Sequence, residues 1–315
     1  MNEETTIASS VSRELLESEI ASLPASTLLH QHHSLQVYLC HAHLIPQVLR
    51  EIGIQRETTF RAVGEGTGLA IDLDEYDEFY LHLFLWDREQ GKIVGGYRLG
   101  VVSQLLAALG SRGLYTSTLF GFSPELLTQL HSGIELGRSF VTPAYQGHPF
   151  VLSLLWKGIG TFVARNPQHH LLFGPVSISN DYSHLSRCLM VEFLRQEKMH
   201  DDWSALVQPR MPFVSSLPAP HERKIRECSN VDHVTAVISD IEQDQKGVPI
   251  LLKHYLKLNA RVLSFNVDEN FANALDVLIV TDLLEAPEQT IKRYLGADGW
   301  ERIHEHSQNE QLCCA

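Results

Sequence analysis

Two opposite charges occupy a predicted strand over residues 134–141, which reads IELGRSFV. Glu135 and Arg138 stand where a buried strand would be apolar, and their three-residue spacing predicts that they point to opposite faces of the sheet. A positioned carboxylate can take a proton from an amine, and an arginine can grip a substrate carboxylate in a bidentate manner. The strand therefore carries residue types suited to acid–base chemistry on an amine. An ion pair closing a sheet edge would use the same two residues.

Further charged and aromatic residues interrupt the chain upstream of this strand: Arg56 and Phe60 in RETTF, Asp74 and Asp77 in DEYD, and Arg98 in GGYRL. Each of them alone is more typical of a surface position. Burying such charges together on neighbouring elements of one sheet requires that they pair with one another. The combination is thus a more specific indication of a site than any single residue.

The order of the predicted elements is that of a mixed sheet fold. It runs strand 35–40, helix 44–63, two β-rich runs in 79–102 around a hairpin turn at 87–91, strand 134–141, helix 150–165, strand 171–179 and helix 182–196. A helix and a final pair of strands follow residue 248. Strands interleaved with helices indicate an α/β or α+β fold.

The length of 315 residues and the 44% hydrophobic share suit a core that is stable without disulfides or metals. We expect a single domain over residues 31–300, preceded by a polar lead-in over 1–30 with one short amphipathic helix. Four prolines predict an irregular excursion around residues 201–230. We expect a flexible tail over residues 301–315.

Composition excludes several classes of protein. The formal charge of −13 argues against a nucleic-acid binder, because counterion release needs a basic face. Five scattered cysteines fit a reducing compartment, and neither a signal peptide nor a membrane-spanning run is recognisable. The 17 histidines show no spacing typical of a metal site, so we predict no metal. We therefore expect a cytoplasmic protein, with at most transient contact at the inner membrane.

The motifs RETTF, DEYD, GGYRL and ELGRS resemble, in this order, those of acyl-homoserine-lactone synthases, which are GNAT-like acyltransferases. Residues 14–300 resemble more closely the "hemolysin-like" GNAT N-acyltransferases related to the enzymes of ornithine-lipid synthesis. The segments FRAVGEGTG, YLHLFLWDRE, GLYTSTLF, ELGRSFV, LLWKGIG and LFGPVSISNDYS carry this similarity. The resemblance implies a GNAT-like fold, with a central mixed β-sheet flanked by helices. It also implies transfer of a fatty or 3-hydroxy-fatty acyl group from an acyl carrier protein thioester to the amine of an amino acid or a similar small molecule.

The same resemblance implies catalytic roles for four residues. Glu135 would deprotonate the attacking amine, and backbone amides near Phe140 and Val141 would stabilise the oxyanion. Tyr182 would protonate the leaving thiolate, although it serves equally well as a residue at the start of a helix.

A second group of residues is implied to bind the acceptor. Asp74, Asp77, Arg98 and Arg138 would position the amine-bearing molecule. Arg56 and Phe60 would order a mobile segment that closes over it.

The donor is implied to be an acyl-phosphopantetheine, on the carrier protein or on coenzyme A, and no permanently bound cofactor is expected. Its phosphate would lie at the start of the helix over 150–165, beside Tyr145, Gln146, Gly147 and His148. The strict Q/R-x-x-G-x-G/A loop is absent here, since Gly147 is the one glycine in YQGHPFVL. A carrier-protein donor needs less cradling of a pyrophosphate. Apolar residues of FVLSLLWKGIG and LLFGPVSIS are expected to line the acyl chain.

Two other interpretations stay open: O-acylation of a lysophospholipid or another alcohol, and a non-catalytic protein that binds acyl carrier protein or lipid. The six charges described above argue against a protein that only binds. The sequence HLFLWD matches the H-x-x-x-x-D signature of glycerolipid acyltransferases from His82 to Asp87, but it lies along a predicted core strand, where a chance match is favoured.

Overall fold

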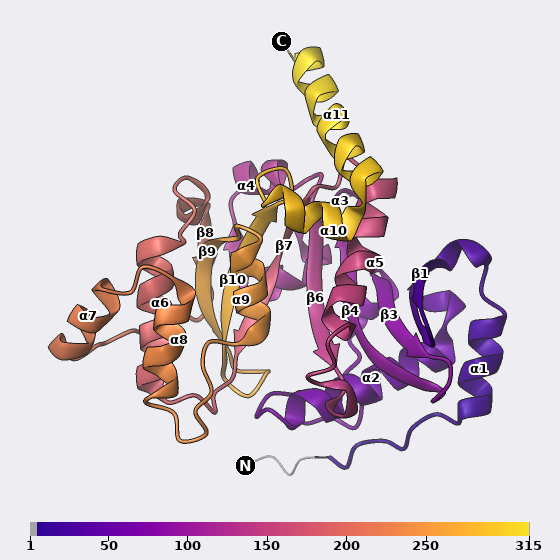
Figure 1. Ribbon diagram of the computed structural model, residues 1–315, viewed down its shortest axis with the longest axis horizontal. Coiled ribbons are helices and arrows are strands. Elements are labelled where there is room, and N and C mark those ends of the chain that lie inside the picture. Colours follow the sequence, from indigo (N-terminus) through magenta and orange to yellow (C-terminus); the bar gives the residue numbers. More distant parts are fainter. Residues whose placement is uncertain (1–4, 315) are drawn as a thin grey trace. The chain divides into compact units, whose positions relative to one another are not determined.

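The computed structural model describes residues 5–314, which form two compact units (Figure 1). The first unit takes the chain up to Leu114, Ser132–His170, and Glu288 onward. The second takes Tyr115–His131 and Leu171–Pro287. The prediction of one domain over residues 31–300 stays a prediction.

The first unit is built on five strands: β1 (Leu28–His32), β2 (Leu35–His41), β3 (Leu81–Asp87), β4 (Lys92–Val101) and β6 (Ile134–Val141). They are ordered β1-β2-β3-β4-β6, and each neighbouring pair is antiparallel. The sequence predicted four of these strands. It missed β1 because LLHQH is largely polar and none of its residues is fully buried.

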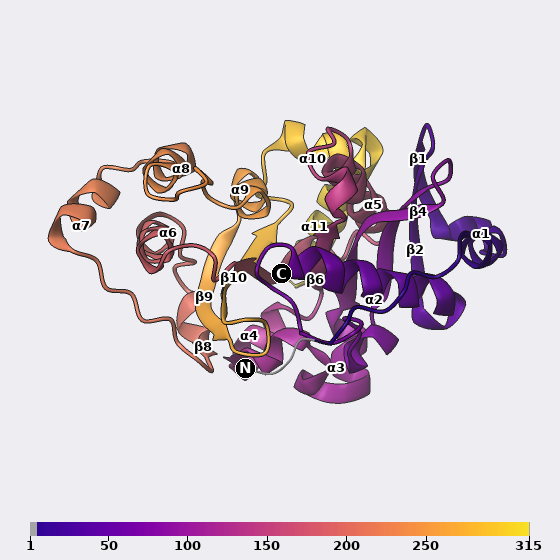
Figure 2. The ribbon, with the colours of Figure 1, turned by 90° about the horizontal axis from the view of Figure 1, so that it is seen from below.

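Helices α2 (Pro46–Arg61) and α5 (Val151–Arg165) pack on this sheet, and Figure 2 shows α2 lengthwise. A Cβ on Gly158 of α5 would lie 2.6 Å from Val37 and 2.8 Å from Leu83, so this glycine allows close packing. His82 precedes Leu83 in β3, so the alternation of the strand directs it to the other face. There it contacts Asp77, which accepts a hydrogen bond from Arg56 of α2. The two helices thus cover opposite faces of the sheet.

Smaller elements complete the first unit. Helix α1 (Arg13–Ala21) is the amphipathic helix expected in the lead-in, and Leu16 and Ile20 bury its apolar side. Helices α3 (Val102–Leu109) and α10 (Glu288–Leu295) were not predicted. Short 3-10 turns lie at Ala25–Thr27, Ala42–Leu44, Glu75–Glu78, Gly110–Gly113 and Pro143–Tyr145.

The end of the chain differs from the flexible tail predicted over residues 301–315. Helix α11 (Ala297–Cys314) runs through this segment up to residue 314 and is the yellow helix at the top of Figure 1. It packs against α5 and α10, and Ile303 is fully buried in that contact. The packing of Ile303 therefore stabilises a helix that the polar sequence of this segment did not predict. Residue 315 lies outside the described residues.

The second unit holds an antiparallel sheet ordered β7 (Leu171–Ile178), β10 (Ala274–Asp282) and β9 (Arg261–Asp268), and a small pair of β5 (Phe120–Phe122) with β8 (Val207–Pro209). Its helices are α4 (Pro124–Gln129), α6 (His184–Glu197), α7 (Ala219–Arg226), α8 (Val231–Ser239) and α9 (Ile250–Lys257), with 3-10 turns at Tyr115–Thr118 and Trp203–Leu206. The final hairpin and the helices α6 and α9 were predicted.

The excursion predicted around residues 201–230 is less irregular than expected, since it includes β8 and α7. Pro218 is the N-cap of α7 and Pro220 lies in its first turn. Proline is tolerated there because the first amides of a helix have no partner within it. Prolines that indicated loop thus begin a helix.

Strands and helices interleave in both units, so the predicted α/β class is confirmed. Among residues 5–314, no helix combines the length and the apolar character needed to cross a bilayer.

Candidate active site

A cluster of charged side chains is buried between α2 and the sheet of the first unit. Arg56 Nη1 lies 2.7 Å from Asp77 Oδ1, and the two side chains are 1% and 4% exposed. Arg98 Nη1 lies 3.3 Å from Asp77 Oδ2 and also donates to Asp74. The structure therefore brings these four predicted residues together.

The DEYD segment places both carboxylates by folding on itself. Asp74 is the N-cap of the 3-10 turn Glu75–Glu78 and accepts a hydrogen bond from the amide of Tyr76 at 3.0 Å. Asp77 Oδ2 accepts from the amide of Asp74 at 2.9 Å. This reciprocal capping fixes the two side chains toward the sheet.

The guanidinium groups keep the central carboxylate charged. Burial alone would raise the pKa of Asp77, but Arg56 and Arg98 outweigh that effect and hold the pKa well below its usual range. Asp77 is therefore a structural counter-ion rather than a base near neutral pH.

His82 lies against the same cluster without being charged. Its Nε2 is 2.8 Å from the carbonyl oxygen of Asp77, and burial, reinforced by Arg56, lowers the pKa of His82 to about 4. Asp87, five residues on, accepts instead from Tyr145 Oη at 2.8 Å. The two ends of HLFLWD thus serve separate structural roles and form no dyad.

A β-bulge interrupts β6 within its ELGRS motif. Gly96 pairs with Phe140 and Arg98 pairs with Gly137, so β6 holds one residue more than β4 between these pairs. Arg138 lies in the bulge with φ 48°, in the left-handed region that non-glycine residues rarely adopt. A regular strand would have kept Glu135 and Arg138 on opposite faces.

The bulge directs Arg138 to the same charged cluster. Its Nε lies 3.1 Å from Asp72 Oδ2 and its Nη2 lies 3.5 Å from Asp74 Oδ2. Asp74 is also the partner of Arg98, whose strand position pairs with β6 on the face of Glu135. The predicted separation onto opposite faces is therefore wrong, because the extra residue breaks the two-residue alternation.

Glu135 is 1% exposed and accepts a hydrogen bond from the hydroxyl of Tyr80. The guanidinium of Arg98 lies 5.1 Å from the centre of the Tyr80 ring, close enough for a cation–π contact. Sequence reasoning missed Tyr80, since it singled out charges. In the structure, Gly100, the strand partner of Glu135, leaves room for this ring, because a Cβ on it would lie 2.5 Å from the Tyr80 ring.

Open space adjoins Glu135 on its own strand. Gly137, two residues along, faces the same side, and a Cβ built on it meets nothing within 4 Å. A carboxylate, a guanidinium on the neighbouring strand and an empty volume therefore lie on one face.

The segment after α2 is bound by Phe60, whose carbonyl accepts from the amide of Glu65 at 2.9 Å, and by Glu57, which the sequence analysis did not single out. Glu57 accepts from the amides of Thr67 and Gly68 at 3.1 and 2.9 Å and from Arg61 at 2.6 Å. Phe60 is buried. The signal was the glycine-rich stretch after α2, whose amides need acceptors.

The two predicted oxyanion residues lie just past the bulge. Phe140 pairs with Gly96 and Val141 with Gly95, and the amide of Thr142 donates to the carbonyl of Val94 at 2.9 Å. Antiparallel pairs alternate, so the amide of Phe140 is directed at β4 while that of Val141 is directed at the opposite edge of β6.

The four residues predicted near the donor phosphate precede α5. Gly147 has φ 77° and His148 is exposed, whereas Gln146 Nε2 donates to the carbonyl of Val141 at 3.1 Å. Tyr145 is tied to Asp87 as described. No side chain caps the start of α5, and the amide of Val151 donates to the carbonyl of His148 at 3.4 Å.

Tyr182 lies in the second unit, before α6. Its hydroxyl donates to the carbonyl of Gly247 at 2.7 Å, and Lys246 Nζ lies 4.5 Å from its ring centre. These contacts fit a residue that holds the start of a helix. Its role toward a leaving thiolate stays a prediction.

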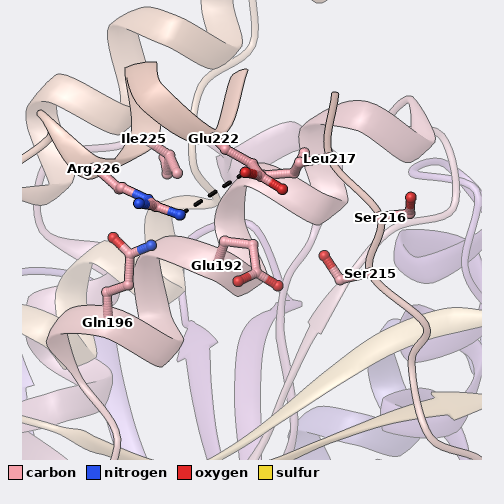
Figure 3. A pocket seen from close by; sticks show the side chains of 8 residues that line it. All are labelled: Glu192, Gln196, Ser215, Ser216, Leu217, Glu222, Ile225 and Arg226. Carbon is pink, nitrogen blue, oxygen red and sulfur yellow. Dashed lines mark ion pairs between the residues drawn. The ribbon is translucent and has the colours of Figure 1, made fainter. Parts of the chain in front are cut away.

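A cavity of about 380 Å³ lies in the second unit (Figure 3). It is lined by α6, α7 and the chain before α7, through Glu192, Gln196, Ser215, Ser216, Leu217, Glu222, Ile225 and Arg226. None of the predicted site residues lines it, and its polar walls are unlike those that an acyl chain requires. Within the described part of the chain, no group of three or more His, Cys, Asp or Glu residues is placed to hold a metal ion.

Comparison with known proteins places this geometry in a family. Residues 55–157, which contain the charged cluster, match the model of the acetyltransferase (GNAT) domain. The glycine N(alpha)-acyltransferase of Bacteroides thetaiotaomicron is 33% identical over 275 residues, covering 83% of this chain and 80% of that protein. This chain is a GNAT N-acyltransferase. The predicted family and the prediction of an enzyme are thereby confirmed.

Two further proteins are similar to this GNAT N-acyltransferase. The L-ornithine N(alpha)-acyltransferase of Agrobacterium fabrum is 26% identical, covering 71% of this chain and 72% of that protein. A solved structure of a CoA-dependent acyl-homoserine lactone synthase with SAM and isopentyl-CoA is 13% identical with a TM-score of 0.40, covering 85% of this chain and 98% of that chain.

Proposed function

We propose that this N-acyltransferase moves a fatty or 3-hydroxy-fatty acyl group from an acyl-phosphopantetheine thioester to the α-amino group of glycine. The observation that carries the proposal is the buried carboxylate of Glu135 beside the open space at Gly137. The glycine acceptor is supported by the 33% identical relative, which is a glycine N(alpha)-acyltransferase. A small acceptor also suits a site whose arginines and aspartates are already paired.

In this mechanism the neutral amine attacks the thioester carbon directly. Glu135 takes the proton that the amine loses, and the amide of Val141, directed away from β4, stabilises the oxyanion. Arg138 is the cluster arginine with the most exposed side chain, at 11%, and would receive the carboxylate of the acceptor.

The donor thioester is proposed to be on acyl carrier protein. Its phosphate would lie at the uncapped start of α5, near Gly147 and His148. The departure from the strict phosphate loop favours a carrier protein over coenzyme A. An N-acyl amino acid product would partition into membranes, which fits transient contact with a bilayer.

Ornithine is the second candidate acceptor. The 26% identical relative is an ornithine N(alpha)-acyltransferase, and Asp74, whose side chain is 25% exposed, offers a carboxylate to a second ammonium group. Asp74 already contacts Arg98 and Arg138, which makes it a weaker partner for a further cation.

The experiment supplies acyl carrier protein and coenzyme A thioesters, each with glycine, ornithine or a lysophospholipid, and identifies products by mass spectrometry. We expect N-acylglycine, which should disappear in Glu135→Gln and persist in Glu125→Gln, a change at an exposed position. An ester product would support O-acylation. Binding of acyl carrier protein without any product would support a non-catalytic protein.

A further inference from the structure

The hydroxyl of Tyr80 lies between two acceptors. It donates to Glu135 Oε2 and lies 3.1 Å from the carbonyl oxygen of Gly113. A phenol carries one hydrogen, whereas an ionised carboxylate and a carbonyl only accept. The hydrogen therefore serves one of the two acceptors at a time.

The protonation state of Glu135 decides which acceptor is served. When Glu135 is ionised, the Tyr80 hydrogen points to the carboxylate. When Glu135 is protonated, its own O–H donates to the Tyr80 oxygen, and the Tyr80 hydrogen turns to the carbonyl of Gly113. In both arrangements Tyr80 and Glu135 stay hydrogen-bonded to each other, which matters because a buried polar group that loses its partner is costly.

We propose that Tyr80 is a positioning residue that lets the buried Glu135 accept and release a proton, by switching its hydroxyl between Glu135 and Gly113. The inference rests on the proposed function. During transfer the N–C bond forms and the C–S bond breaks, while the amine proton passes to Glu135 and the Tyr80 hydrogen turns to Gly113. The leaving thiolate takes a proton from solvent, and release of the Glu135 proton restores the first arrangement.

The surroundings of Tyr80 hold its ring still while its hydrogen turns. The side chain is 1% exposed, and its ring lies over the backbone of Gly100, where a Cβ would come within 2.5 Å. Arg98 lies on the ring at 5.1 Å. The acceptor Gly113 ends a 3-10 turn, and a Cβ on it would lie 2.9 Å from the carbonyl of Leu105. The Tyr80 ring and the Gly113 carbonyl are therefore both held in place.

The test is the pH dependence of kcat/KM for Tyr80→Phe. Losing a donor to the ionised carboxylate disfavours that form, so we expect the acidic limb of the profile to move up by about one pH unit. Tyr38→Phe is the matched control, since its buried ring also loses a hydroxyl hydrogen bond on this sheet, to Gln36 at 3.1 Å. Its profile should stay that of the wild type.

A second variant and a double-mutant cycle distinguish the positioning role of Tyr80 from a purely structural role. If Tyr80→Phe does not fold, Gly100→Ala provides the same test. It keeps the hydroxyl but displaces the ring, and should also shift the acidic limb of the profile. In the Glu135→Gln background, Tyr80→Phe should cause no further loss, because Tyr80 acts through Glu135.

The outcomes distinguish the two proposals. An active wild type, an inactive Glu135→Gln and an unmoved limb in both Tyr80→Phe and Gly100→Ala would overturn the role of Tyr80 alone. An undiminished Glu135→Gln enzyme would overturn the proposed function instead.

Discussion

Arg56 and Asp77 join helix α2 to the DEYD turn through a contact of 2.7 Å that is almost fully withdrawn from solvent. Water cannot replace either partner there, so each side chain depends on the other. The Arg56–Asp77 pair therefore stabilises the charged cluster, and its contribution to the free energy of unfolding can be measured.

We expect Asp77→Asn to lower the free energy of unfolding by about 3–5 kcal/mol, because it leaves two buried guanidinium groups without their shared counter-ion. Urea denaturation followed by circular dichroism measures the change. Glu17→Gln is the control, since it breaks the Arg13–Glu17 pair, whose side chains are about half exposed, and should change stability little. If both substitutions changed the free energy of unfolding equally, the buried pair would contribute no more to stability than the exposed pair.

Stability should fall as pH is lowered from about 6.5 to 4. Folding lowers the pKa of His82 from 6.5 to about 4 through burial, so in this interval the unfolded chain binds a proton that the folded chain does not. The lowered pKa of Asp77 adds a loss at more acidic pH, where the unfolded carboxyl takes up a proton first. Urea denaturation across pH 4–7 measures the slope. His82→Gln should reduce that slope, whereas His131→Gln, at an exposed position, should leave it unchanged.

The bulge at Arg138 gives a prediction about backbone strain. Arg138 has φ 48°, which costs a non-glycine residue of order 1–3 kcal/mol unless its side chain compensates. Arg138→Ala and Arg138→Gly both remove the contacts to Asp72 and Asp74, but only glycine relieves the strain. We expect the glycine variant to unfold at higher urea than the alanine variant, with both inactive. The reverse order of stability would contradict the assignment of strain to this position.

The sequence predicted the elements of the sheet better than the geometry of the site. Apolar and β-rich composition indicated β2, β3, β4 and β6, and β3 and β4 are buried along almost their whole length. The bulge could not be foreseen, since no glycine marks the left-handed position that Arg138 occupies.

Tyr80 was missed for a related reason. A neutral aromatic residue between an acidic turn and an apolar strand is typical of the hydrophobic core, and Tyr80 is indeed buried. Its contact with Glu135 joins residues 55 positions apart, which local pattern does not indicate. The charges in the sequence indicated residues that the fold brings together, and tertiary packing determined which groups contact Glu135.

Filling the space beside Glu135 tests where the acceptor lies. A Cβ on Gly137 meets no atom within 4 Å, so Gly137→Ala and Gly137→Val should fold as the wild type does. If glycine binds in this space, kcat/KM for it should fall in the order wild type, alanine, valine, by about tenfold or more for valine, a loss of ~1.4 kcal/mol of transition-state binding. Gly121→Ala, in strand β5 of the second unit, is the control, because its Cβ would also avoid close contact, lying 3.8 Å from Gln208. Stopped assays with labelled glycine measure the rates, and melting curves check folding. A folded Gly137→Val enzyme with unchanged kcat/KM would place the acceptor elsewhere.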